Sequence, residues 1–266
     1  MPGFPPDLLT PVEEIAWRVA RVQAAMALQA LDALFILQNA DLYYFSGTVQ
    51  DGLVAIPARG EPVFLVRRVA ERARAESPLR RIVAAESPRA YPALLAAEGL
   101  GGLRRVGLEL DVLPAAQYLR QQRAFPGIEL VDASELIRAV RAVKRPWEVG
   151  QMRRAAAIQD RMLRRLCEVL KPGMTEVELS AEMDGEGRRA GHQGFIRFRR
   201  FNQEVFVGHF LAGEHAALPA FTDAPTGGLG VGPALGNEAG GDQGPEMLRA
   251  RLMAERRRSE ATGLVR

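Results

Sequence analysis

The side chains best suited to metal or acid–base chemistry in this sequence are its three histidines and the acids near them. These residues are His192, His209, His215, Glu214 and Asp223. No histidine belongs to an HExxH pair, and no spacing matches a zinc site on one helix or strand. His209 and His215 would share a face of a straight strand, but Gly213 between them disfavours one. The sequence therefore predicts no metal ligand and no catalytic residue among them.

A second group of interest is cationic and aromatic. It consists of Arg197, Arg199 and Arg200 next to Phe198 and Phe201. Because a guanidinium can bind a carboxylate through two hydrogen bonds, these three arginines are candidates for contact with a carboxylate ligand. The same pattern is typical of a solvated strand edge, which is the simpler interpretation.

Two further motifs lack the context that catalysis needs. Gly227-Gly-Leu-Gly-Val-Gly232 is not followed by Lys-Ser/Thr and does not open a helix, so we expect a plain loop. Ser46 and Ser180 do not lie in a nucleophile elbow. Neither motif predicts a phosphate site or a serine nucleophile.

Cys167 is the one cysteine of the chain, which excludes a disulfide framework and a multi-cysteine metal site within it. Leucines flank it at helical spacing (Leu163, Leu166 and Leu170). This spacing predicts a small, buried core residue rather than a reactive thiol.

Composition places the chain among ordinary globular proteins. It has 266 residues, 47% hydrophobic and 25% charged, enough for one large domain or two ordinary ones. The N-terminus has no signal-peptide pattern, and no apolar run approaches the ~20 residues of a membrane helix. We therefore expect a cytoplasmic protein that does not span a membrane.

The formal net charge of +3 could suggest a nucleic-acid partner. However, residues 242–266 carry six arginines against four acids, which leaves only +1 on the other 241 residues. The charges of that body are interspersed, and no groove-reading motif or stacking aromatic array accompanies them. We predict no nucleic-acid binding.

The first half of the chain alternates short apolar strands with helical segments. Strands are expected at 33–37, 52–57, 62–66, 81–84, 105–109 and 128–131, and helices at 15–31, 87–98, 114–124 and 134–143. Ala58-Arg-Gly-Glu61 predicts a hairpin between the second and third strands, so the sheet is mixed rather than wholly parallel. This alternation is typical of an α/β domain.

The pattern changes near residue 144. Pro146 opens a long helix, about 147–170, which Lys171-Pro-Gly173 ends. Thr175-Glu-Val-Glu178 has the spacing of a capping box and starts a second helix to about residue 190. Short strand-like pieces follow at 195–198 and 204–207.

Several ordered motifs resemble the creatinase / Xaa-Pro aminopeptidase / prolidase group, whose catalytic half has the pita-bread fold. The matching segments are Asn39-Ala-Asp-Leu-Tyr-Tyr-Phe-Ser-Gly47, read as a strand followed by a turn, residues 130–148, residues 171–179, residues 191–204 and residues 208–219. The resemblance runs from about residue 15 to 241.

The resemblance implies a definite domain order. Residues 1–144 would form an α/β creatinase-like N-terminal domain with a mixed sheet, and residues 145–241 an incomplete α+β pita-bread catalytic domain. Residues 242–266 would be a basic, non-native or disordered tail, because they show no strand alternation and resemble a shifted reading frame or a premature end.

The same resemblance implies metal-dependent hydrolysis of Xaa-Pro peptide bonds, or of a related amidino substrate, by a homodimeric parent. Active members hold two divalent ions (Mn, Co or Zn) through two Asp, a His and two Glu that lie beyond the point this chain reaches. We therefore expect no cofactor in this chain and no activity. In aminopeptidase-like members a substrate-side His follows a Gly-Glu-Asn motif by a few residues. Here the motif reads Gly213-Glu-His215 and the corresponding place falls near Ala220, which argues against a standard peptidase. The candidates for substrate contact are His209, His215 and Arg199.

Two alternatives remain open from the sequence. The chain could serve as a non-catalytic dimerisation or binding module through its N-terminal domain. A basic nucleic-acid binder would require tight binding that survives deletion of residues 242–266.

Overall fold

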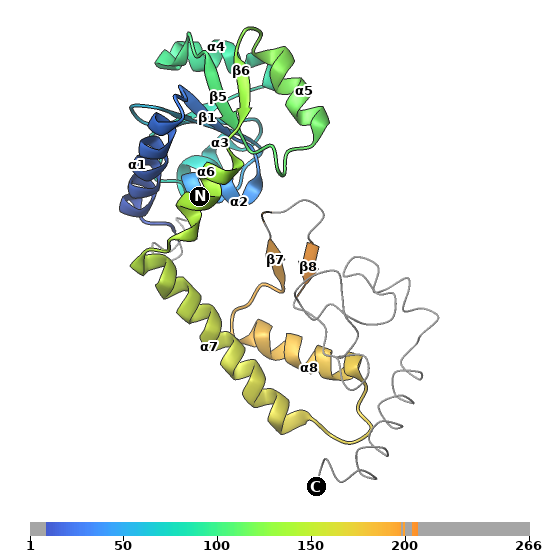
Figure 1. The fold of residues 1–266 in the computed structure, drawn as a ribbon. Coiled ribbons are helices and arrows are strands. Elements are labelled where there is room, and N and C mark those ends of the chain that lie inside the picture. Colours follow the sequence, from blue (N-terminus) through green and yellow to red (C-terminus); the bar gives the residue numbers. More distant parts are fainter. Residues whose placement is uncertain (1–8, 198, 200–203, 207–266) are drawn as a thin grey trace. The chain divides into compact units, whose positions relative to one another are not determined.

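The computed structural model describes residues 9–197, 199 and 204–206, and these fall into two compact units (Figure 1). The N-terminal unit holds residues 9–147 and Arg199. The second unit holds residues 148–197 and 204–206. Residues 242–266, predicted as a basic tail, lie outside the described residues.

A six-stranded mixed sheet organises the N-terminal unit, in the order β4-β3-β2-β1-β5-β6. Its strands are β1 (Ala33–Ile36), β2 (Gly52–Pro57), β3 (Val63–Val66), β4 (Arg81–Ala84), β5 (Arg105–Leu108) and β6 (Glu129–Asp132). The β1–β2 and β2–β3 pairs are antiparallel, whereas β3–β4, β1–β5 and β5–β6 are parallel. The predicted hairpin and mixed sheet are therefore confirmed.

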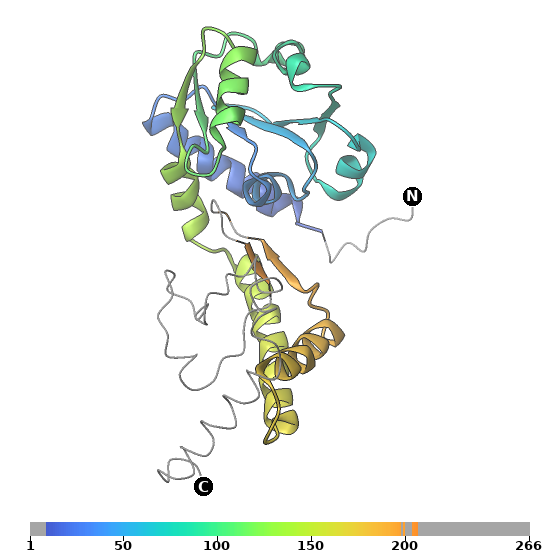
Figure 2. The same ribbon diagram turned by 90° about the vertical axis from the view of Figure 1, so that its right-hand side faces the viewer.

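Both faces of this sheet are covered by helices (Figures 1 and 2). One face packs against α1 (Val12–Leu28), α2 (Asn39–Ser46), α3 (Ala70–Glu76) and α6 (Ser134–Ala142). The other packs against α4 (Tyr91–Leu95) and α5 (Ala115–Ala124), with η2 (Pro88–Ala90) and η3 (Ala96–Leu100) flanking α4. This is the α/β layering that the sequence predicts.

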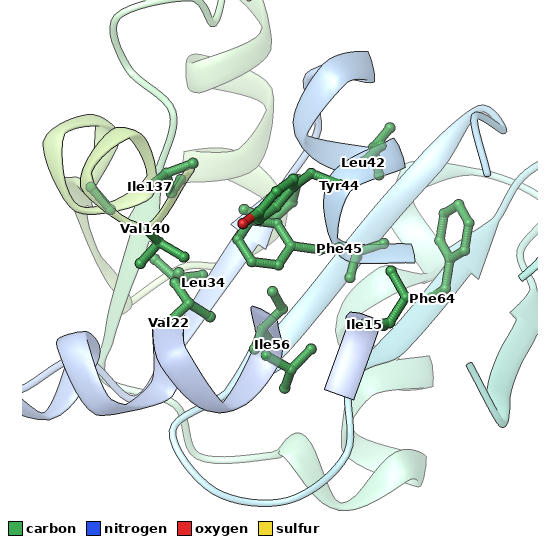
Figure 3. Packing of buried hydrophobic residues seen from close by; sticks show 14 of the residues in the cluster. Ile15, Val22, Leu34, Leu42, Tyr44, Phe45, Ile56, Phe64, Ile137 and Val140 are labelled. Carbon is green, nitrogen blue, oxygen red and sulfur yellow. The ribbon is translucent and has the colours of Figure 1, made fainter. Parts of the chain in front are cut away.

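Alternate residues of the strands belong to two separate hydrophobic clusters, one on each face of the sheet, because successive strand side chains point to opposite faces. Leu34, Ile56 and Phe64 belong to the first cluster, where they pack with Phe45 of α2 and Ile137 of α6 (Figure 3). The second cluster contains Ala33, Phe35, Leu53, Val63, Leu65, Tyr91, Leu95 and Phe125. The continuous apolar runs of the strands thus reflect burial on both faces.

Helices α2 and α3 are differences from the sequence expectation. The stretch Asn39–Ser46 forms a helix rather than a strand and turn, because the Gln38 side chain accepts hydrogen bonds from the amides of Ala40 and Asp41. Gly47 then ends the helix in the left-handed conformation, at φ 77°. The run Tyr43-Tyr44-Phe45 favours a strand, so the sequence did not predict this helix. Helix α3 was not predicted because it has only seven residues.

The second unit begins in α7 (Pro146–Val169), continues through α8 (Glu176–Arg189), and ends with the antiparallel strands β7 (Phe195–Arg197) and β8 (Glu204–Phe206). Gly173 adopts φ 86° in the turn between the helices. The predicted capping box is confirmed: Thr175 Oγ1 accepts from the Glu178 amide at 3.1 Å, and Glu178 Oε2 accepts from the Thr175 amide at 2.8 Å.

Thr175→Ala is expected to lower the free energy of unfolding by about 1 kcal/mol, because the Glu178 amide loses its acceptor at the start of α8. Amide exchange at Glu178 should accelerate, measured with urea unfolding of the same variant. Thr175→Ser keeps the hydroxyl and serves as the control. Equal exchange rates in the two variants would show that the cap does not stabilise α8.

The prediction that Cys167 is buried is wrong, since its side chain is exposed. Within α7 the buried residue is Met162, and its Sδ would lie 3.1 Å from a Cβ placed on Gly187 of α8. Leu163 and Leu170 are also exposed, so the face that carries Cys167 points away from α8. Helical spacing identified an apolar stripe but not the side of α7 that packs.

Candidate functional site

Glu109 marks the edge of the sheet where polar groups gather. It follows β5 directly, and β5 runs parallel to β1, so the two strands end at the same edge. Glu109 Oε2 accepts hydrogen bonds from the amides of Leu37 at 2.7 Å and Gln38 at 3.0 Å, which follow β1. The carboxyl group is fully buried, so the sheet itself fixes its position.

Asp41 lies beside Glu109 and is also fully buried. The first turn of α2 carries it, and a helix N-terminus favours an acidic group. Its two carboxylate oxygens bind two guanidinium groups, from Arg141 at the end of α6 and from Arg199. A buried carboxylate is thus paired with two cations, as burial requires.

Arg199 bridges two acids. Besides contacting Asp41, its Nη1 donates to Asp111 Oδ2 at 2.6 Å, and its side chain is only 7% exposed. Asp111 also receives Arg138 Nη1 at 3.3 Å. The predicted candidate Arg199 therefore contacts carboxylates of this chain. We call Asp41, Glu109, Asp111, Arg141 and Arg199 the acid-pair site.

The pKa values of Glu109 and Asp111 are shifted in opposite directions. Burial raises the pKa of Glu109 well above its usual range, and its hydrogen bond to Asp41 raises it further, against the lowering effect of the two amides. Burial also tends to raise the pKa of Asp111, but the hydrogen bonds from Arg199 and Ser134 outweigh it and the pKa is lowered. Of these two acids, Glu109 is the one whose surroundings favour the protonated form.

These shifts give opposite pH dependences. The contribution of Glu109 to stability is fully present below the usual glutamate pKa of about 4.3 and is lost as pH rises through its raised folded-state pKa. The contribution of Asp111 is present above the usual aspartate pKa of about 3.9 and is lost as pH falls through its lowered value.

The acid-pair site does not suit a divalent cation. Two guanidinium groups already occupy the oxygens of Asp41, and like charge at such short range opposes a metal ion. Throughout the described part of the chain, no group of three His, Cys, Asp or Glu side chains could hold a metal. The described residues therefore do not fit a dinuclear centre, and we derive no catalytic step through one.

Of the histidines, only His192 is described. Its Nδ1 accepts the Gly194 amide at 3.0 Å, so it stabilises the turn before β7. The substrate-contact candidates His209 and His215 lie outside the described residues, and their roles stay predictions.

Sequence reasoning missed Asp41 and Glu109 as interacting groups. A usable signal existed: each acid follows a buried strand, at positions 33–36 and 105–108, and parallel neighbouring strands end at one edge. Recognising this signal required knowing that β5 pairs with β1, although β2, β3 and β4 lie between them in the sequence.

A groove of about 390 Å³ lies between α7 and α8, lined by Arg161, Arg164, Arg165, Glu168, Glu186 and Arg189. Glu186 accepts Arg161 at 2.7 Å and Arg189 at 3.3 Å, while Arg165 binds Glu182 at 3.1 Å. Most of its cations are thus neutralised within the groove.

Among the described helices, none is long and apolar enough to cross a bilayer.

Two family models match the chain in succession. The Creatinase/Prolidase N-terminal domain matches residues 18–143, and Metallopeptidase family M24 matches residues 150–240. With the mixed sheet and the helices already described, these matches show that the chain belongs to the pita-bread Xaa-Pro peptidase group. Its fold class is a creatinase-like α/β domain followed by a segment that matches the pita-bread M24 family over residues 150–240.

Individual relatives support the same placement. The probable dipeptidase PepE of Mycobacterium bovis is 30% identical over 181 residues, covering 64% of this chain and 48% of the relative. Ectoine hydrolase of Halomonas elongata is 28% identical over 248 residues, covering 80% and 59%. The Xaa-Pro dipeptidase from Bacillus anthracis has a similar fold, with a TM-score of 0.61 at 22% identity over 66% of this chain and 50% of that one. The chain spans about half the length of the relatives it matches.

Proposed function

We propose that this chain belongs to a metal-dependent hydrolase of Xaa-Pro peptide bonds, of which it carries the N-terminal domain and the opening part of the catalytic domain. The observation that carries this proposal is the succession of the two family matches, 18–143 and 150–240. The names of the relatives, a dipeptidase and a hydrolase, support hydrolysis. In the parent, two divalent ions would activate water and polarise the scissile carbonyl.

We propose further that these 266 residues do not catalyse that reaction by themselves. The family resemblance assigns the metal ligands to sequence further along than this chain, and the described residues contain no group that could replace them. His209, His215 and Arg199 keep a proposed role beside the substrate rather than on the metal. We also propose a cytoplasmic location and a homodimeric parent.

The test is proline release from an alanyl-proline dipeptide by the purified chain with Mn²⁺, Co²⁺ or Zn²⁺. A full-length dipeptidase relative is the positive control, and ectoine is a second substrate. No product above the metal-only background is expected. Product that appears with metal and disappears with a chelator would overturn the claim of inactivity.

A second function is favoured by the completeness of the N-terminal unit. Its sheet has helices on both faces and two buried cores, as a self-contained folding unit does, and we propose that this unit can serve as a binding or dimerisation module. Size-exclusion chromatography with light scattering distinguishes the outcomes. A defined dimer would support the module, whereas a monomer or a polydisperse aggregate would count against it.

A further inference from the structure

One buried oxygen of the acid-pair site, Glu109 Oε1, would have no hydrogen-bond partner if every acid of the site were ionised. Glu109 Oε2 accepts both backbone amides that follow β1, whereas Oε1 is buried and accepts no hydrogen bond. Asp41 is the side chain that lies within reach of a hydrogen bond from Glu109. Two carboxyl groups form such a bond only when one of them holds a proton.

The charges of the surrounding elements agree with a proton at this place. Asp41 and Tyr44 face the site from α2, Glu109 and Asp111 from the segment after β5, Arg138 and Arg141 from α6, and Arg199 completes it. The arginine contacts of this site go to Asp41 and Asp111, and among the described residues no cation contacts Glu109. An ionised Glu109 would therefore be a buried negative charge without a cation in contact with it, which is costly.

We propose that Asp41 and Glu109 form a proton-binding site whose occupancy is coupled to the anchoring of Arg199. A single proton resides on Glu109 and is donated to Asp41, and when it leaves it passes to bulk water. A cation beside the pair favours the ionised form, so the anchoring of Arg199 promotes proton release. Because coupling is reciprocal, proton release strengthens the attachment of Arg199.

This coupling would link pH to the attachment of Arg199, a residue within the part of the chain matched by the M24 family model. It is independent of the proposed hydrolytic function, since it requires no metal ion and no substrate. The site would remain if the chain proved to be a binding module.

The direct test is ¹³C NMR of the full chain with glutamate labelled at the side-chain carboxyl. Glu109→Gln assigns the resonance, and the amide of glutamine can still donate to Asp41 while its oxygen accepts the two backbone amides. The wild type should show one glutamate that titrates well above the usual glutamate range and is missing from Glu109→Gln. Absence of such a resonance overturns the proposal.

Arg199→Gln tests the coupling. Removing the cation should raise the titration midpoint of Glu109 by about one pH unit, a tenfold gain in proton affinity. Arg199→Lys should keep the midpoint near that of the wild type, and Arg72→Gln, which removes a cation paired with Glu76 elsewhere, should leave it unchanged. An unchanged midpoint in Arg199→Gln would contradict the coupling even if the shared proton is present.

A stability measurement provides a second readout of the proton. As pH rises, the wild type should lose stability relative to Glu109→Gln, because only the wild type has a proton to release. Glu61→Gln, an exposed substitution of the same type, should follow the wild-type profile. Parallel profiles for the wild type and Glu109→Gln would refute a shared proton.

Discussion

Asp41→Leu is expected to destabilise the N-terminal unit by about 3–5 kcal/mol, which is the usual cost of removing one partner from a buried ion pair. The substitution leaves the guanidinium groups of Arg141 and Arg199 without their shared acceptor, although Arg199 remains only 7% exposed. It also removes the acceptor for the Glu109 proton. Urea unfolding followed by far-UV circular dichroism measures the loss.

Two comparisons separate this effect from ordinary surface electrostatics. Asp41→Asn should lose less than Asp41→Leu, since the amide oxygen still accepts one hydrogen bond. Asp51→Asn, which weakens the more exposed pair with Arg67, should cost about 1 kcal/mol or less. If Asp41→Leu cost no more than Asp51→Asn, the acid-pair site would not be a structural anchor.

Gly52→Ala is expected to be the other large change, at about 3 kcal/mol, because it forces atoms into an occupied space. A Cβ on Gly52 would lie 2.0 Å from the carbonyl oxygen of Leu65 and 3.1 Å from Phe64 Cε2. The oxygen belongs to the backbone of β3, so β2 and β3 would have to separate locally. Thermal unfolding of the variant should show a clear drop in Tm.

Gly101→Ala is the matched control in the same unit. The nearest atom to its added Cβ is the Ala96 Cβ at 3.6 Å, an ordinary contact. Its Tm should stay close to that of the wild type. A Tm of Gly52→Ala equal to that of Gly101→Ala would show that the β2–β3 spacing is more tolerant than the structure indicates.

Much of the architecture could be predicted because local rules and global packing agree in it. The turn at 58–61 lies between two apolar strands, and the capping box at Thr175 and Glu178 follows a helix-ending glycine. Each signal is local, so a single sequence contains it. The expected bounds of β4 and α8 agree with the observed bounds within a residue or two, because local sequence signals and global packing favour the same structure there.

The features that could not be predicted depend on distant contacts. Helix α2 forms in a stretch rich in aromatic residues because the Gln38 side chain caps it and its apolar side chains pack on the sheet. The pairing of Asp41 with Arg141 joins residues 100 positions apart. The exposure of Cys167 was missed because a helical apolar stripe does not reveal which neighbour covers it.

Equilibrium metal binding is the decisive measurement, because we propose that the chain carries a creatinase-type domain and part of a metallopeptidase domain without its metal ligands. The purified chain is dialysed to equilibrium against Mn²⁺, and bound manganese is counted per chain by elemental analysis. We predict no stoichiometric binding of manganese. Two tightly bound manganese ions per chain, removable only by a strong chelator, would contradict the account.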